Sequence, residues 1–190
     1  MDDSGRRWGA EVRSHLNLPN QLTILRLLLV PVIAVSLAIK FTDHYQVSVV
    51  AYAAAAATDT LDGRIARARH QVTELGKFLD PLVDKVMVIT VLVILVEKSL
   101  LAAWVVVVVF AREFIITGLR SVAAAQGVVV SASPWGKSKT LTQNCMIGLL
   151  MLAQPYPVLQ PAATVFIYLA VVATVLSGLD YLWRYRGFVM

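Results

Sequence analysis

The stretch that decides the fold is Asp59-Thr60-Leu61-Asp62-Gly63-Arg64-Ile65-Ala66-Arg67, which is followed by Gly76, Asp80 and Asp84. It introduces four carboxylates into a chain that is 58% hydrophobic. Helix residues three or four apart lie on one face, so Asp59 pairs with Asp62 and Asp80 pairs with Asp84. The polar residues 68–74 are expected to form a short connection that folds the second helix back on the first. The sequence therefore predicts that two acidic helix faces meet.

Four carboxylates that lie close together need bound cations, because like charges raise one another's pKa. The cluster offers only oxygen ligands and contains no His or Cys, which favours Mg²⁺ or Mn²⁺ over zinc. We expect two divalent cations held by Asp59, Asp62, Asp80 and Asp84. The simpler alternative is a pair of acidic helix ends solvated at a membrane surface. It fits poorly, because Asp80 and Asp84 lie within an apolar run.

The composition is that of an all-α membrane protein. The 190 residues are only 15% charged, and the mean hydropathy is +0.71, which is outside the usual range of soluble domains. The net charge of +5 does not indicate nucleic-acid binding, because Lys and Arg flank apolar segments instead of forming a soluble patch. Cys145 is the single cysteine, so no intramolecular disulfide can form.

The apolar segments predict six transmembrane helices in one domain, residues 20–186. A juxtamembrane segment, residues 1–19, precedes them and is expected to contain a short amphipathic helix, because Trp8, Val12 and Leu16 recur every four residues. About 20 residues are needed to cross the hydrocarbon core. The predicted spans are 21–39, 47–66, 78–96, 101–119, 138–153 and 162–183.

The distribution of Lys and Arg predicts the orientation. With six spans, most of them fall on the side that holds both termini, which is therefore the cytoplasmic side of the cell membrane. In this topology the ionisable residues inside the spans all fall in the cytoplasmic half. These residues are Arg26, Asp59, Asp62, Asp80, Asp84, Lys85, Arg112, Glu113 and Asp180. Because such groups face a bundle interior or a wet cavity, we expect a polar cavity that opens to the cytoplasm.

The pattern Asp59-x₂-Asp62-Gly63-x₂-Ala66-Arg67-x₈-Gly76-x₃-Asp80-x₃-Asp84 resembles, without departure, the signature of the CDP-alcohol phosphotransferases. This resemblance implies a six-helix fold, two metal ions and often a homodimer. It also implies in-line attack of an alcohol on the β-phosphorus of a CDP-linked lipid, with release of CMP. The four aspartates would bind the metals, and Asp84 would also take the proton from the attacking hydroxyl.

The same resemblance implies a set of residues that contact the CDP-linked lipid. From the residues alone, Gly63 and Ala66 also fit the close packing of helices through small residues, and Arg67 also fits a topology-determining arginine. The residues implied as contacts are Asn20, Gly63, Ala66, Arg67, Thr73 and Gly76.

The acceptor is predicted from segments outside the aspartate motif. Residues 17–26, 78–85, 111–113 and 136–140 resemble the phosphatidylglycerophosphate synthase branch of the family, which implies CDP-diacylglycerol and sn-glycerol 3-phosphate as substrates. Basic side chains would bind the acceptor phosphate. For the two lysines the alternative is interfacial anchoring, and for Arg112 it is an ion pair with Glu113. The candidate residues are Arg112, Arg120, Lys137 and Lys139.

Two other functions fit parts of the pattern. A sibling transferase with inositol phosphate, serine or phosphatidylglycerol as acceptor would keep the aspartates and change the basic residues. A divalent-ion transporter would use the carboxylates to carry metal as cargo. Against transport, the acidic residues gather towards one side, and no inverted repeat is apparent. We therefore predict an enzyme whose partners are its two substrates, membrane lipids and a second copy of the chain.

Overall fold

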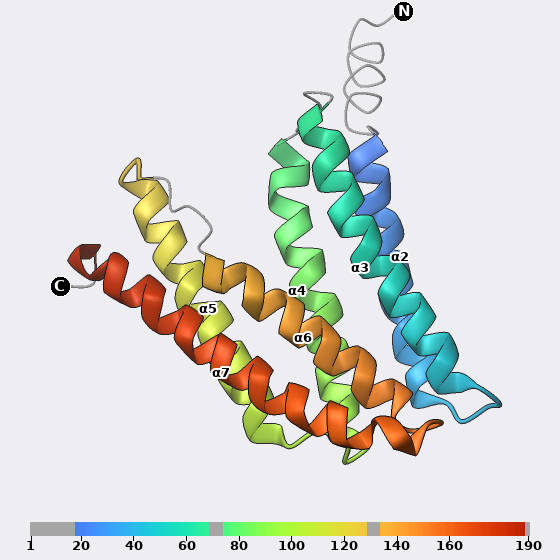
Figure 1. Ribbon diagram of the computed structural model, residues 1–190. Helices are drawn as coiled ribbons and strands as arrows, with labels where there is room; N and C mark the ends of the chain where they lie inside the picture. The colour runs from blue at the N-terminus through green and yellow to red at the C-terminus, as the bar shows by residue number, and fades with distance from the viewer. Residues whose placement is uncertain (1–17, 69–73, 129–133, 189–190) are drawn as a thin grey trace, which may run out of the picture. The chain divides into compact units, whose positions relative to one another are not determined.

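The computed structural model describes residues 18–68, 74–128 and 134–188. Within these ranges the chain forms six α-helices and two short 3₁₀ turns, with no β-strand (Figure 1). The expectation of an all-α fold is therefore confirmed. The predicted amphipathic helix within residues 1–19 falls almost entirely outside the described residues.

Each of the six helices covers most or all of one predicted span. Their bounds differ from the prediction by a few residues in most cases, because polar residues at the span ends continue the helices. The helices are α2 (Leu18–Ala38), α3 (His44–Ala68), α4 (Glu74–Glu97), α5 (Ala103–Ala125), α6 (Pro134–Leu152) and α7 (Gln160–Arg184), with 3₁₀ turns η1 (Pro157–Leu159) and η2 (Arg186–Phe188).

Helix α5 extends six residues beyond its predicted end at residue 119, which shortens the expected connection at 120–137. It ends where Gly127 adopts a positive φ of 75°. The Val128 N–H then bonds to the Ala123 carbonyl at 2.9 Å, and the Gly127 N–H bonds to the Ala124 carbonyl at 3.0 Å. This pattern is a glycine-terminated helix end, so the glycine, not Arg120, ends the helix.

The chain divides into two compact units, residues 1–94 and 95–190, with the division inside α4. In the first unit α2 packs along α3, and buried Ile33 and Leu37 on α2 and Ala55 on α3 form part of its core. Ser36 and Ser48 also join the two helices through a hydrogen bond between their hydroxyls at 2.9 Å. Helices α3 and α4 run in opposite directions, so the C-terminal end of α3 and the N-terminal end of α4 lie at the same end of this unit (Figure 1).

In the second unit α7 packs against both α6 and α5. Buried residues of α7 are small or polar along one side, and these let the neighbouring helices approach closely. They face a core of larger apolar side chains from α5 and α6 that includes Val105, Val109, Met146 and Leu150. The buried residues of α7 are Ala163, Ala170, Ala173, Thr174, Ser177 and Tyr181.

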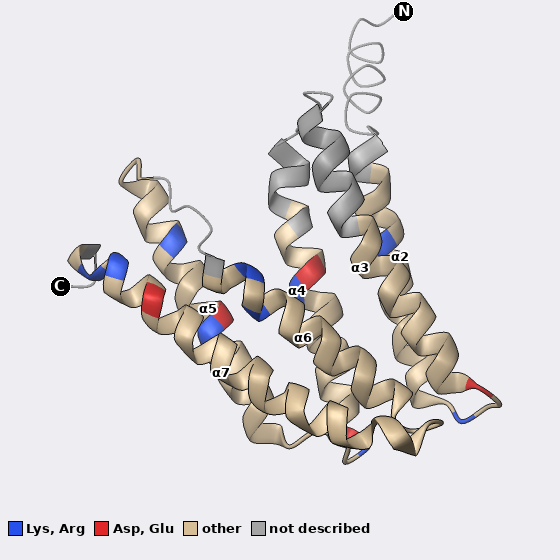
Figure 2. Ribbon diagram, in the orientation of Figure 1, with Lys and Arg blue, Asp and Glu red and all other residues tan. Residues whose placement is uncertain are grey.

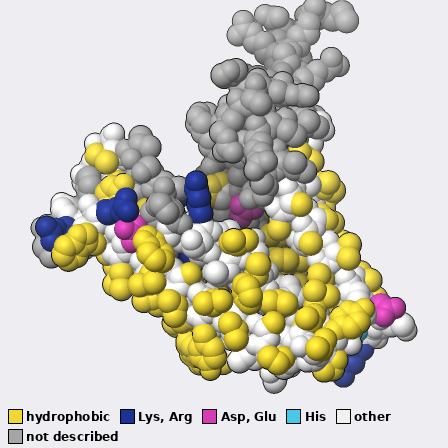
Figure 3. Space-filling model, viewed as in Figure 1, with side chains coloured by type: hydrophobic (Ala, Val, Ile, Leu, Met, Phe, Trp, Pro, Cys, Tyr) yellow, Lys and Arg dark blue, Asp and Glu magenta, His cyan; other side chains and the backbone are white. Residues whose placement is uncertain are grey.

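Two helical segments are long and apolar enough to cross a membrane: Gln21–Ala38 and Pro157–Arg184. Large apolar side chains are exposed on the described helices, among them Val107, Leu141 and Val165, and hydrophobic side chains cover much of the face in Figure 3. A surface of this kind suits lipid better than water. Helix α5 carries Arg112, Glu113 and Arg120 within its apolar sequence. The other four predicted spans stay a prediction.

Candidate functional site

Charged side chains are sparse on the described helices (Figure 2). In the first unit, Arg26 of α2 is completely buried and donates from Nη1 to Oδ1 of Asp84 on α4 at 2.6 Å. The side chain of Asp84 is 37% exposed. A buried guanidinium is strongly unfavourable without a charged partner, so this ion pair explains why an arginine can occupy the interior. It also holds the Asp84 carboxylate from its buried side.

The sequence placed Arg26 and Asp84 in the same half of the predicted spans, but it did not predict that Arg26 is the partner of this carboxylate. The helical placement of the aspartates is confirmed, since Asp59 and Asp62 lie on α3 and Asp80 lies on α4 with Asp84. The side chains of Asp59, Asp62 and Asp80 are outside the described part of the chain. The meeting of the four carboxylates stays a prediction.

Most of the residues predicted to contact the CDP-linked lipid lie at the end of the first unit where α3 ends and α4 begins. Asn20 lies in the first turn of α2 and Gly76 in the first turn of α4. Gly63, Ala66 and Arg67 lie in the last turns of α3. Thr73 falls outside the described residues. The helices thus bring these backbone positions towards one end, and the roles of their side chains stay predictions.

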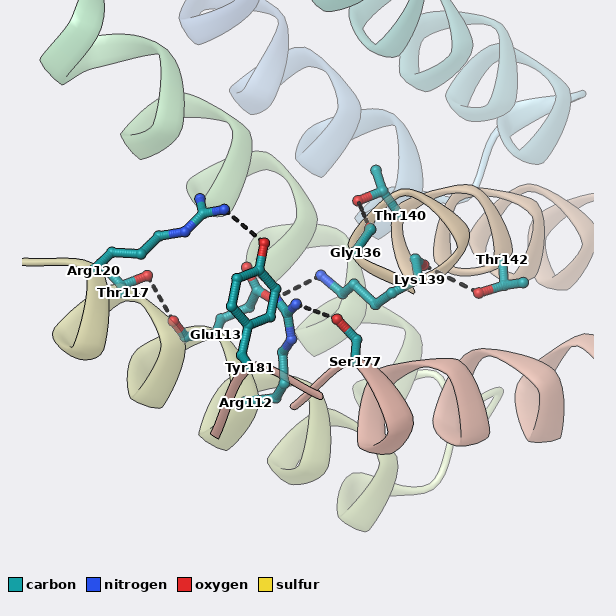
Figure 4. A network of polar contacts seen from close by, with 10 residues as sticks. All are labelled: Arg112, Glu113, Thr117, Arg120, Gly136, Lys139, Thr140, Thr142, Ser177 and Tyr181. Carbon is teal, nitrogen blue, oxygen red and sulfur yellow. Dashed lines mark hydrogen bonds and ion pairs between the residues drawn. The ribbon is translucent and has the colours of Figure 1, made fainter. Parts of the chain in front are cut away.

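A second polar group lies in the second unit and joins all three of its helices (Figure 4). Glu113 of α5 accepts two hydrogen bonds at the same oxygen, Oε1. One comes from Nη1 of Arg112 at 2.7 Å, and the other comes from Nζ of Lys139 on α6 at 2.8 Å. Ser177 of α7 accepts from Nη2 of Arg112. The Lys139 side chain is only 8% exposed, so this group lies largely inside the unit.

Tyr181 extends this group towards the end of α7. Its hydroxyl accepts a hydrogen bond from Nη2 of Arg120 at 2.8 Å. The guanidinium carbons of Arg112 and Arg120 lie 5.6 Å and 5.3 Å from the centre of its ring. Both distances are within the range of cation–π attraction. One buried aromatic ring therefore contacts two cations of α5.

The structure thus unites three of the four residues predicted to bind the acceptor phosphate: Arg112, Arg120 and Lys139. Lys137 is exposed on α6 and takes part in none of the hydrogen bonds of this group among the described residues. The alternative proposed for Arg112, an ion pair with Glu113, is confirmed as a contact. Two cations on the Glu113 carboxylate and a third on Tyr181 form a site with surplus positive charge, which suits an anionic group such as a phosphate.

Sequence reasoning missed Ser177 and Tyr181. Their only signal is the spacing of Thr174, Ser177 and Tyr181, which places three polar groups on one face of an otherwise apolar helix. That spacing does not identify which cations they meet. Gly178 was also missed: it lies beside the arginine stem, and a Cβ added there would be in contact with Cγ of Arg112 at 3.4 Å.

We predict that Glu113→Gln destabilises the protein. The change removes the charge that two largely buried cations share, and breaking a buried ion pair costs about 3–5 kcal/mol. Because the Glu113 side chain is 24% exposed, we expect a smaller loss, about 2–3 kcal/mol. Thermal unfolding of the purified protein in detergent should show a midpoint lowered by roughly 5–10 °C.

The matched control is Asp180→Asn, which removes another carboxylate–arginine pair from the same unit. Asp180 Oδ1 accepts from Nε of Arg184 at 2.8 Å; the Asp180 side chain is 18% exposed, but Arg184 is 51% exposed, so water solvates the arginine when the pair is lost. The midpoint of this variant should stay close to that of the wild type. If the two variants have equal midpoints, the Glu113 pairs do not stabilise the fold.

One known protein family matches the part of the chain that contains most residues of both polar groups; the last residues of α7 lie outside this match. The sequence model of the family described as CDP-alcohol phosphatidyltransferase matches residues 16–176. Ser177 and Tyr181 lie just beyond this match. The matched range is 161 of the 190 residues, so the match extends over most of the chain and includes α2 to α6 and most of α7.

Individual relatives are similar over nearly the same range. A Bacillus subtilis (strain 168) protein named CDP-diacylglycerol--glycerol-3-phosphate 3-phosphatidyltransferase is 38% identical over 180 residues, which cover 87% of this chain and 93% of the relative. A Haemophilus influenzae protein of the same name is 34% identical over 177 residues, covering 90% and 94%. A Mycobacterium tuberculosis (strain H37Rv) protein named "Probable phosphatidylglycerophosphate synthase" is 40% identical over 171 residues, covering 88% and 81%.

Proposed function

The chain belongs to the CDP-alcohol phosphatidyltransferase family, and from this premise we propose that it transfers a phosphatidyl group from CDP-diacylglycerol to sn-glycerol 3-phosphate. The products are phosphatidylglycerophosphate and CMP. The names of relatives that align over almost their whole length support this reaction. Our choice of acceptor rests on the polar group formed by Arg112, Arg120, Lys139 and Glu113.

The charge of this group favours an acceptor that bears a phosphate monoester. Three cations and one carboxylate leave a formal charge of +2. A phosphate monoester carries about −1.5 to −2 at neutral pH, so the two charges match. Serine is a zwitterion without net charge, and phosphatidylglycerol carries a single negative charge. Among the sibling acceptors, only inositol phosphate shares the charge of glycerol 3-phosphate.

Within this proposal Arg112, Arg120 and Lys139 bind the acceptor phosphate, and Lys137 contributes from the exposed face of α6. Arg112 already donates from Nη1 to Glu113 and from Nη2 to Ser177, so its orientation is set before the acceptor binds. Arg120 has a more exposed side chain, and its guanidinium can present a planar pair of donors to phosphate oxygens. Arg120 is therefore a stronger candidate in the structure than in the sequence.

We propose that Asp59, Asp62, Asp80 and Asp84 hold two divalent cations, Mg²⁺ or Mn²⁺. Asp84 suits this role because its carboxylate is held by Arg26 from the buried side and is still partly exposed. Carboxylates on two successive helices form the hard, all-oxygen donor set that these ions prefer. Bound cations would neutralise the diphosphate of the CDP-lipid and the departing phosphate of CMP.

Asp84 is also the proposed general base. In the transfer it accepts the proton of the acceptor hydroxyl as that oxygen attacks the β-phosphorus, and the bond between this phosphorus and the CMP oxygen breaks. The Arg26 ion pair fixes the orientation of the carboxylate. Asn20, Gly63, Ala66, Arg67, Thr73 and Gly76 would contact the CDP-lipid.

The proposed setting is the cell membrane, with six spans, both termini in the cytoplasm, and a polar cavity that opens to the cytoplasm. Two apolar helical segments and the exposed apolar side chains support membrane insertion. The positions of Lys and Arg in the sequence support the orientation. We also propose a homodimer, which suits the apolar helix surfaces that one copy leaves exposed.

The experiment that tests this function uses the purified full-length protein with CDP-diacylglycerol, sn-glycerol 3-phosphate and Mg²⁺. We expect CMP release, and we expect mass spectrometry to identify phosphatidylglycerophosphate as the lipid product. Inositol phosphate, serine and phosphatidylglycerol at equal concentration should compete poorly. Preferred use of one of these acceptors would assign the chain to a sibling activity. No CMP release from folded, metal-loaded protein would contradict a transferase of any kind.

A further inference from the structure

Tyr181 is the residue through which the two arginines of α5 are connected. Its side chain is almost completely buried, its hydroxyl accepts from Arg120, and its ring lies within 6 Å of the guanidinium carbons of both Arg120 and Arg112. Figure 4 shows the ring between α5 and α7, with Arg120 directed to the hydroxyl and Arg112 beside the ring. No role follows for this tyrosine from the proposed reaction itself.

Arg120 needs such a restraint most, because Arg112 already donates to Glu113 and Ser177. The two arginines are eight residues apart on α5, about two helical turns or 12 Å along the axis, and both carry a permanent positive charge on a long flexible side chain. Without partners they would repel each other and sample many rotamers. An aromatic ring attracts both cations with its face, and a phenol oxygen adds a directed hydrogen bond to one of them.

The ring itself is rigidly held. Ser177, one turn earlier on α7, accepts from Arg112, so α7 contacts that arginine at two successive turns. Tyr185, one turn later, stacks on Tyr181 with the ring centres 6.3 Å apart. A buried ring between such neighbours has little freedom to move. The guanidinium groups that touch it are thus oriented by a fixed element of the fold.

We propose that Tyr181 is a positioning residue for the acceptor phosphate: it sets the orientation of Arg120 through its hydroxyl, and its ring supports Arg112, before a phosphate monoester binds. This inference rests on the proposed function. Preorganised donors bind an anion more tightly than mobile ones, because less conformational entropy is lost on binding. Tyr181 therefore contributes to selection of phosphorylated acceptors, although the phosphate binds the arginines and not the tyrosine.

The test is Tyr181→Phe, which keeps the ring and its packing and removes the hydroxyl. We expect the KM for sn-glycerol 3-phosphate to rise about tenfold, equivalent to about 1.4 kcal/mol, near the low end for a hydrogen bond to a charged group. The kcat and the KM for CDP-diacylglycerol should stay within about twofold of the wild-type values. Tyr181→Leu also removes the ring and should raise the acceptor KM further.

Two controls separate positioning from a structural role. Tyr185→Phe removes the hydroxyl of the stacked neighbour and should leave both KM values unchanged. Glycerol, which has the attacking hydroxyl but no phosphate, should be used at the same low rate by the wild type and by Tyr181→Phe. A loss of activity that is equal for the two acceptors, together with a lowered unfolding temperature, would show that the hydroxyl only stabilises the fold and would overturn the inference.

The failure of this inference can be told apart from failure of the proposed function. If the wild-type protein releases no CMP with sn-glycerol 3-phosphate, the reaction itself is wrong. If the wild type is active and Tyr181→Phe keeps the wild-type KM for this acceptor, the reaction stands and the role of Tyr181 is wrong.

Discussion

Asp84→Asn is expected to lower kcat by about 10³-fold, within the range that general acid–base groups contribute. The amide that replaces the carboxylate cannot take the proton of the attacking hydroxyl. The change is nearly isosteric, and with Mg²⁺ in excess the other three aspartates can still hold the cations, so the CDP-lipid should still bind with an affinity within about threefold of the wild type. The measurement pairs CMP release under saturating substrates with equilibrium binding of CDP-diacylglycerol.

A second consequence of Asp84→Asn has to be separated from the first. Arg26 is completely buried and donates to Asp84, so the variant removes the charge opposite a buried cation, which is destabilising. The double variant Arg26→Met with Asp84→Asn removes both charges and should recover much of the unfolding temperature. It should remain inactive. Recovery of turnover in the double variant would show that Asp84 serves the fold and not the chemistry.

The matched control for this experiment is Asp43→Asn. Asp43 is exposed in the loop between α2 and α3, with a positive φ of 61° that asparagine tolerates well. Its turnover and its unfolding temperature should equal those of the wild type. Turnover by Asp84→Asn at a comparable rate would remove Asp84 from its assignment as base.

Removal of divalent cations should abolish CMP release completely. Four carboxylates on α3 and α4 cannot be brought close together while all stay ionised unless cations neutralise them. Dialysis against EDTA followed by addition of Mg²⁺ or Mn²⁺ should restore turnover, whereas Zn²⁺, which prefers nitrogen and sulfur ligands, should not. The assay is CMP release as a function of free metal concentration.

Metal binding has a readout that does not depend on turnover. A ligand that binds only the folded state raises its stability, so Mg²⁺ should raise the unfolding temperature of the EDTA-treated protein. Asp84→Asn should reduce this increase, and Asp43→Asn should not. Full turnover in excess chelator, or an equal Mg²⁺ effect on the wild type and on Asp84→Asn, would contradict the proposed metal site.

The helices were predictable because their signal is local. A run of about 20 apolar residues indicates a helix by length alone, and all six predicted runs lie mostly inside observed helices. The main error concerned the end of α5. Arg120 seemed to end an apolar run, but the helix continues through good helix formers to Ala125 and stops at Gly127, where the backbone takes a positive φ. Polarity indicates where a span ends, and the glycine indicates where the helix ends.

The site was predictable only in part, for a related reason. Arg112 and Glu113 are adjacent in the sequence, so their ion pair could be anticipated. Lys139 reaches the same Glu113 oxygen from 26 residues away, and Tyr181 reaches Arg120 from 61 residues away. These contacts depend on how α7 packs against α5 and α6, which a local sequence pattern cannot predict. The charged residues proposed to bind the acceptor were recognisable from the sequence, whereas their partners Ser177 and Tyr181 were not.

Glu113 has a consequence for the end of each catalytic cycle. Glu113 forms ion pairs with Arg112 and Lys139, so neither cation is left without a negatively charged partner when the proposed acceptor site is empty. The phosphate of an incoming acceptor has to replace part of the ion pairing with Glu113. This competition limits the affinity of the proposed site for the phosphate. The proposed product keeps its phosphate and is lipid-anchored, so it leaves by lateral diffusion. A moderate affinity for the phosphate allows the head group of the product to dissociate, which limits product inhibition.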